Sequence, residues 1–92
     1  MYEIRVASSR VGKGLAKIPA EDREKVINEV RKLAENPRPS GIKALAPDIY
    51  RLRIGSYRVI YKVYDDEQII LNGRFARRSE KTYRDWEKLF QD

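Results

Sequence analysis

Residues 50–63 read Tyr-Arg-Leu-Arg-Ile-Gly-Ser-Tyr-Arg-Val-Ile-Tyr-Lys-Val, and this stretch decides the fold. Apolar and basic residues alternate on both sides of a Gly-Ser pair, and a period of two is typical of strands that present two different faces. Two-residue loops that contain glycine are the commonest connections between antiparallel strands. The stretch therefore predicts a β-hairpin whose turn is Gly55 and Ser56.

The turn fixes which residues of the two strands lie opposite each other. The expected pairs are Ile54 with Tyr57, Arg53 with Arg58, Leu52 with Val59, Arg51 with Ile60, and Tyr50 with Tyr61. One face then carries Tyr50, Leu52, Ile54, Tyr57, Val59, Tyr61 and Val63, whose tyrosines are expected in the core. The other face carries Arg51, Arg53, Arg58, Ile60 and Lys62, and Ile60 suggests an apolar patch there that a partner covers.

Two arginines, Arg53 and Arg58, are expected directly opposite each other. Their Cβ atoms would lie about 5 Å apart, and like charges in that arrangement destabilise a sheet. An anion held between the two side chains would turn the repulsion into binding energy. Phosphate is the anion that the planar donor fork of arginine matches best. The simpler alternative is a solvated face of an antiparallel sheet.

Length and composition restrict the classes of protein that this chain can represent. Its 92 residues predict a single domain, residues 1–92, with a modest core. The chain contains neither cysteine nor histidine, which argues against disulfides, metal sites and histidine acid–base chemistry, and we expect no cofactor. No segment reads as a signal peptide or a membrane span, so a cytoplasmic protein without membrane contact is expected.

The formal net charge of +6 is concentrated in one region of the chain. Residues 38–84 carry eleven basic and five acidic groups, whereas residues 1–37 carry eight and six. A basic surplus of this kind is found in proteins that bind nucleic acids, acidic proteins or anionic membranes. The expected hairpin, which lies within the basic region, favours a nucleic acid.

The remaining sequence predicts an α+β fold with the element order β-α-α-β-β-β-α. We expect a first strand at residues 2–7, a short helix capped by Ser8 or Ser9, a helix from Ala20 to Asn36 after Pro19, and a loop to about Pro47. A strand at residues 68–72 follows the hairpin, Gly73 allows a bulge, and residues 74–78 either continue the strand or lead out of it. Residues 80–90 form a closing helix. The sheet is expected to be antiparallel or mixed, with about four strands, and the N-terminal helical pair packs on one face.

Four features in this order resemble the RelE/ParE superfamily of toxins, and more closely its RelE branch. They are the helical pair, the Lys-Ala-Leu segment at residues 43–45, the basic hairpin, and the Arg-rich segment that leads from Arg77 to Tyr83. The resemblance implies the toxin of a type II toxin–antitoxin system, which cleaves messenger RNA on the ribosome without a metal ion. It also implies a cognate antitoxin as partner, through which the complex binds its operator DNA.

The resemblance also implies roles for individual residues. Carried over by position, the family's catalytic groups match Arg51, Arg53, Arg58, Arg77 and Tyr83, which would bind the scissile phosphate and assist attack by its 2′-hydroxyl. The family often has lysines where this chain has Arg51 and Arg53. Further basic groups expected to bind RNA are Lys43, Lys62, Arg78 and Lys81.

Such cleavage requires proton transfers that arginine performs poorly. Because the arginine pKa lies above about 12, the four arginines are assigned to positioning and charge neutralisation. Tyr83 is the best candidate for proton transfer, while Lys43, Lys62 and Glu80 are weaker ones. Two simpler alternatives stay open: a core role for Tyr83, and pairing of Arg77 and Arg78 with the acidic turn at residues 65–67.

Two rival functions remain compatible with the sequence. Toxins of the ParE type share the fold and inhibit DNA gyrase without cleaving RNA, so the fold alone does not decide the activity. An inactive relative that keeps affinity for an antitoxin or a nucleic acid is the other rival.

Overall fold

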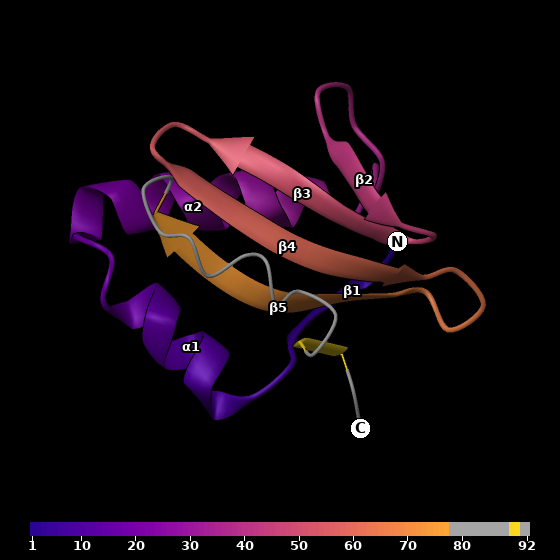
Figure 1. Cartoon of the computed structure of the whole chain (residues 1–92), viewed down its shortest axis with the longest axis horizontal. Coiled ribbons are helices and arrows are strands. Elements are labelled where there is room, and N and C mark those ends of the chain that lie inside the picture. The colour runs from indigo at the N-terminus through magenta and orange to yellow at the C-terminus, as the bar shows by residue number, and fades with distance from the viewer. Residues whose placement is uncertain (78–88, 91–92) are drawn as a thin grey trace.

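The computed structural model describes residues 1–77 and 89–90, which form two helices and five strands in that part of the chain (Figure 1). The elements are β1 (Glu3–Val6), α1 (Ser9–Ala16), α2 (Ala20–Lys32), β2 (Lys43–Ala46), β3 (Ile49–Ile54), β4 (Tyr57–Tyr64) and β5 (Ile69–Arg77). Helix α2 lies behind the sheet in Figure 1, and α1 lies beside β5. The predicted α+β class is confirmed.

The strands form one mixed sheet in the order β1-β5-β4-β3-β2. Strand β1 is parallel to β5, and the other neighbours are antiparallel. The prediction of about four strands is corrected to five, because the predicted loop before Pro47 contains β2. The expected closing helix lies outside the described residues except for Leu89 and Phe90.

The hairpin of β3 and β4 has the predicted register at all five expected pairs, including Arg53 opposite Arg58. At its turn Gly55 has a φ of 57°, a left-handed conformation that glycine adopts at the least cost. Glycine at the first position of a two-residue turn matches the twist of the two strands. The turn thereby fixes which side chains share a face.

The core lies between α2 and one face of the sheet. Three side chains of the helical segment, Val26, Val30 and Leu33, are buried against the sheet face that carries Tyr61. The Tyr61 ring is fully buried, and its hydroxyl donates a 2.8 Å hydrogen bond to the carbonyl oxygen of Pro37. Burial raises the pKa of this hydroxyl well above its usual range. Tyr61 is therefore a core residue, as predicted.

Ile60 faces the opposite side of the sheet but is only 1% exposed. The protein itself covers this side chain. The prediction that Ile60 belongs to an apolar patch awaiting a partner is therefore wrong. The alternation of apolar and basic residues correctly assigned Ile60 to its face of the sheet, but it could not show which part of the protein covers that face.

Strand β5 continues past Gly73 to Arg77, which is the first of the two alternatives for the segment after Gly73. In its pairing with β4, Ile60 lies opposite Arg74 and Tyr61 opposite Asn72, so Gly73 is the extra residue of a bulge. The position leaves no room for a side chain, because a Cβ atom would lie 2.7 Å from the Phe90 ring. The predicted bulge is confirmed, and it changes which later residues share a face.

Candidate nucleic-acid interface

The strand registers gather basic side chains on the sheet face opposite α2. Lys43, Arg51, Ile60 and Arg74 form one row across β2, β3, β4 and β5; Arg53, Arg58 and Ala76 form the next row, and Lys62 lies on the same face. We call Lys43, Arg51, Arg53, Arg58, Lys62 and Arg74 the hairpin face. Within the described residues, strands β2 to β5 contain no Asp or Glu.

Arg53 and Arg58 form the cross-strand pair of like charge on this face. Arg53 is exposed, whereas Arg58 is half-buried and its Nε atom is fully buried. The Nε atom of Arg74 is buried as well. Burial of the inner part of a guanidinium limits its motion, so these two cations are held in defined positions on the sheet.

Other predicted basic groups border the pair. Arg51 and Lys62 are half-buried, and Lys43 is exposed at the β2 edge opposite Arg51. The Lys62 ammonium lies 5.0 Å from the centre of the Tyr64 ring, within the range of a cation–π interaction. The structure thus brings together five of the sequence-predicted site residues: Lys43, Arg51, Arg53, Arg58 and Lys62.

Arg77 lies on the other face of the sheet. It is opposite Tyr57, in the row that faces the helices, and its charge lowers the pKa of the Tyr57 hydroxyl. Burial and the hydrogen bond to Asp22 (3.0 Å) outweigh that effect, so the Tyr57 pKa is raised. The predicted convergence of Arg77 with Arg58 is therefore not seen.

Arg74 takes the place on the hairpin face that the sequence analysis gave to Arg77. The reason is the bulge at Gly73, which shifts the alternation of the residues that follow it. Sequence reasoning could have found Arg74 from the predicted bulge by continuing β5 beyond it. Three further candidates, Arg78, Lys81 and Tyr83, lie outside the described residues.

Arg38 forms a separate cluster with acidic residues and tyrosines, at the end of the hairpin that is far from its turn. Arg38 donates to Asp65 (2.8 and 3.1 Å), to Asp48 (2.9 Å) and to the Tyr50 hydroxyl (2.8 Å), while Tyr2 also donates to Asp65 (2.6 Å). The hydrogen bonds from Arg38 and Tyr2 lower the pKa of Asp65 to about 2. Because two carboxylates neutralise Arg38, this cluster joins chain segments rather than attracting anions.

The alternative pairing of Arg77 with the acidic turn at residues 65–67 is not what the structure shows, since Arg77 lies opposite Tyr57, at the end of β4 and β5 that is far from that turn. Arg78, the other arginine of that alternative, lies outside the described residues. Residues 1–77 and 89–90 contain no group of three or more acidic side chains placed to hold a metal ion. Within the same residues, no helix combines the length and apolar character needed to cross a membrane.

The sequence and the fold both match known toxins. The family described as the ParE toxin of the type II toxin–antitoxin system parDE matches residues 8–82. A protein of Methanocaldococcus jannaschii named "Putative toxin RelE1" is 36% identical over 74 residues, which cover 75% of this chain and 82% of the relative. The chain belongs to the RelE/ParE superfamily of toxins. It is a RelE-like toxin of a type II toxin–antitoxin system.

Solved structures of RelE toxins share the whole architecture. The free Escherichia coli RelE carrying two arginine-to-alanine substitutions superposes with a TM-score of 0.81 at 22% identity, covering 98% of each chain. The RelE–RelB complex of Pyrococcus horikoshii gives a TM-score of 0.73 at 24% identity, covering 86% of this chain and 97% of the other. At these identities the structures establish a RelE fold.

Proposed function

We propose that this RelE-like toxin is an endoribonuclease that cleaves messenger RNA on the ribosome. The observation that supports the proposal most strongly is the hairpin face, where six cations lie on strands that contain no acidic residue within the described chain. Folding alone gives no reason to place Arg53 opposite Arg58, because the pair repels. A bound phosphate removes that repulsion.

Cleavage by the RNA's own 2′-hydroxyl involves three tasks. The hydroxyl loses a proton, the pentavalent phosphorane gains negative charge, and the leaving 5′-oxygen gains a proton. Arg51, Arg53 and Arg58 are suited to the second task, since guanidinium groups donate several hydrogen bonds to phosphate oxygens and remain charged. Electrostatic groups of this type each contribute about 10²–10³ in rate when they are preorganised.

The proton transfers are assigned to Tyr83, the candidate carried over from the family resemblance, which lies outside the described residues. Tyrosine is a weak base, so alignment of the messenger by the ribosome supplies a large part of the rate. This account needs no metal ion or cofactor. Arg77, on the other face of the sheet, is assigned a supporting role in binding RNA instead of direct contact with the reacting phosphate.

The proposed partners follow from the same account. A cognate antitoxin neutralises the toxin by covering the hairpin face or displacing the C-terminal segment, as expected for a relative of proteins solved as RelE–RelB complexes. The toxin acts in the cytoplasm, where ribosomes and messenger RNA are present. The antitoxin carries the complex to its operator DNA.

Inhibition of DNA gyrase is the second candidate function. It is favoured by the description of the matching family, which is that of ParE toxins. It also requires no general base, and the hairpin face of the described residues contains none suited to neutral pH. Under this alternative the basic face binds protein or DNA without chemistry.

One experiment separates the two candidates. Purified toxin is incubated with messenger RNA in the presence and absence of ribosomes, and in parallel with gyrase and relaxed plasmid. We expect cleavage that depends on ribosomes, strong loss of cleavage in Tyr83→Phe, and unchanged supercoiling. Intact RNA together with blocked supercoiling would refute the endoribonuclease and support the gyrase inhibitor.

A further inference from the structure

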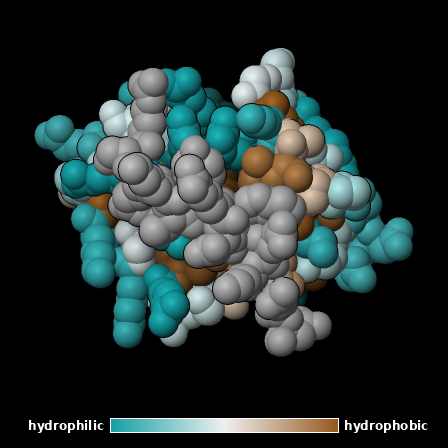
Figure 2. Space-filling view, in the orientation of Figure 1, coloured by the Kyte–Doolittle hydropathy of each residue, from teal (hydrophilic) through white to brown (hydrophobic). Residues whose placement is uncertain are grey.

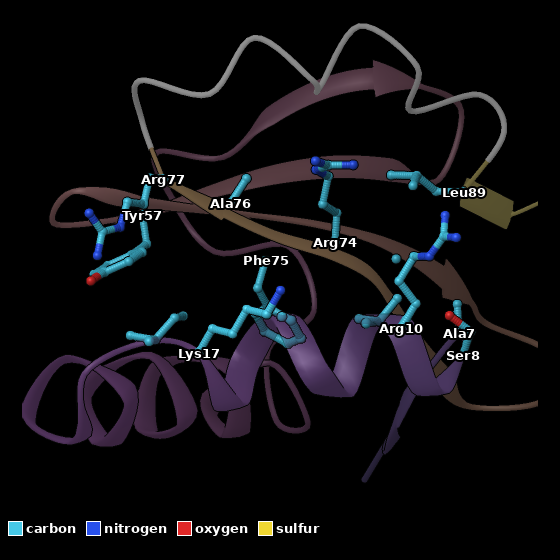
Figure 3. Close-up of a pocket in the computed structure, with 14 residues that line it drawn as sticks. Ala7, Ser8, Arg10, Lys17, Tyr57, Arg74, Phe75, Ala76, Arg77 and Leu89 are labelled. Atoms are coloured by element: carbon cyan, nitrogen blue, oxygen red, sulfur yellow. The ribbon is translucent and has the colours of Figure 1, made fainter.

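A groove runs between α1 and the C-terminal half of β5, away from the middle of the hairpin face (Figure 3). It exists because β1 pairs only with Ile69–Asn72, so the rest of β5 has α1 rather than a strand beside it. Gly14 of α1 lies against β5, where a Cβ atom would make an ordinary contact of 3.8 Å with the Phe75 carbonyl oxygen. The groove has a volume of about 570 Å³.

Four basic residues line this α1/β5 groove: Arg10 from α1, Lys17 directly after the helix, and Arg74 and Arg77 from β5. None of the described residues that line it is Asp or Glu. Asp22 lies at the Arg77 end, where its Oδ2 atom accepts a hydrogen bond from the Tyr57 hydroxyl. Figure 2 shows hydrophilic side chains projecting at the lower left margin, the region of α1 in Figure 1. The groove therefore favours an anionic ligand.

The spacing of the cations indicates a chain rather than a single ion. Arg10 and Lys17 are seven residues apart on a helix, which corresponds to about 10 Å along its axis. Arg74 and Arg77 are three residues apart on a strand, about 10 Å along it, and their side chains leave opposite faces of the sheet. Figure 3 places Arg10 nearer the Leu89 end and Lys17 nearer the Tyr57 end. One phosphate cannot reach both ends, whereas a chain with a charge at every link can.

Arg74 connects this groove with the hairpin face. It lines the groove and also lies in the row of Arg51 and Ile60. In Figure 3 its side chain projects away from α1, toward the face that carries that row. A strand of RNA bound on the hairpin face could thus continue around the edge of β5 and remain in contact with cations.

We propose that the α1/β5 groove binds the phosphate backbone of RNA at a second site, outside the site of cleavage. The inference rests on the proposed function in taking RNA as the partner. The groove adds affinity and orientation, while the hairpin face supplies the chemistry. An acidic protein segment is the competing occupant, and it is less favoured because it would not explain the continuity through Arg74.

The test uses the double variant Arg10→Ala/Lys17→Ala of the full chain. Both side chains belong to exposed residues, so the fold is expected to persist. The matched control is Lys25→Ala/Arg31→Ala, which removes the same charge from exposed positions of α2. The probe is a labelled 12-nucleotide single-stranded RNA with 2′-O-methyl riboses, which binds but cannot be cleaved.

We expect the groove variant to bind the probe about tenfold more weakly than the control at low salt. The slope of log affinity against log salt concentration should fall by about 1.4, because two phosphate contacts of about 0.7 each are lost on a single strand. Sedimentation with ribosomes that lack messenger forms a second arm. If the groove variant loses affinity for the probe in the first arm, the groove is assigned to messenger RNA. If it loses binding to ribosomes in the second arm, the groove is assigned to ribosomal RNA.

Equal affinity and slope for the groove variant and the control, in both arms, would overturn the proposal. So would a loss of affinity for poly-L-glutamate without a loss for RNA, since that result would assign the groove to an acidic protein segment. A toxin that binds the probe as expected but never cleaves messenger would refute the proposed catalysis and leave this inference standing.

Discussion

The facing arginines Arg53 and Arg58 predict a measurable repulsion that salt at about 1 M removes. Cross-strand neighbours have Cβ atoms about 5 Å apart, and we take the two guanidinium charges to be about 7 Å apart. At that separation in water the Coulomb energy is about 0.6 kcal/mol. Because Arg53 is exposed, the dielectric of water is the appropriate choice.

A double-mutant cycle isolates this energy. The free energy of unfolding in urea is measured for the wild type, Arg53→Gln, Arg58→Gln and the double variant. Arg53→Gln relieves the repulsion only when Arg58 is present. We therefore expect its effect on the free energy of unfolding to be about 0.6 kcal/mol more stabilising with Arg58 than with glutamine at that position. The stability of a single Arg58 variant reflects both the repulsion and the other contacts of Arg58. The cycle subtracts those other contacts and leaves the repulsion.

Ionic strength provides the internal check. The coupling should persist in 0.01 M salt, where the Debye length is about 30 Å, and vanish in 1 M salt, where it is about 3 Å. A control cycle of Arg53 with Arg31, on the exposed side of α2, should show no coupling at either concentration. Zero coupling for Arg53 and Arg58 in low salt would refute the reasoning that this pair is held at a cost to stability.

Three further predictions concern the rest of the fold. Tyr61→Phe should lower the free energy of unfolding by about 1 kcal/mol, because it removes the hydrogen bond to the carbonyl oxygen of Pro37. Urea unfolding measures this loss, and an unchanged free energy of unfolding would contradict the hydrogen bond. Asp65→Asn should flatten the acid dependence of stability. The folded-state pKa of about 2 lies below the unfolded value, so this stabilisation is present above about pH 4 and is lost as the pH falls through 2. Unfolding of both proteins between pH 5 and 2 tests it, and parallel curves would disprove it. Gly73→Ala should destabilise by about 1–3 kcal/mol through overpacking against Phe90, and thermal unfolding with an unchanged melting temperature would count against that packing.

The hairpin could be predicted completely because its information is local. A two-residue turn leaves one register, and the period of two then assigns every side chain to a face. The bulge at Gly73 was predicted from the glycine itself, because alternation does not phase the consecutive Ile69, Ile70 and Leu71. It could not reveal β2, since Lys-Ala-Leu-Ala lacks the β-branched residues typical of strands and pairs only because the edge of β3 is available.

The candidate site was predicted in part for similar reasons. Residues on β3 and β4 follow the turn, so Arg51, Arg53, Arg58 and Lys62 were placed correctly on one face. Arg77 was not, because its face depends on the bulge earlier in β5. The Arg38 cluster was missed entirely, since its partners come from distant segments and no local pattern connects them.

The cleavage rate of Arg58→Ala on the ribosome shows whether the hairpin face binds the reacting phosphate. The rate is measured under single-turnover conditions beside Arg58→Lys and the control Arg31→Ala, each checked by urea unfolding. The account predicts a loss of about 10²–10³ for alanine, a partial recovery for lysine and no change for the control. A folded Arg58→Ala protein that cleaves within about threefold of the wild type would contradict it.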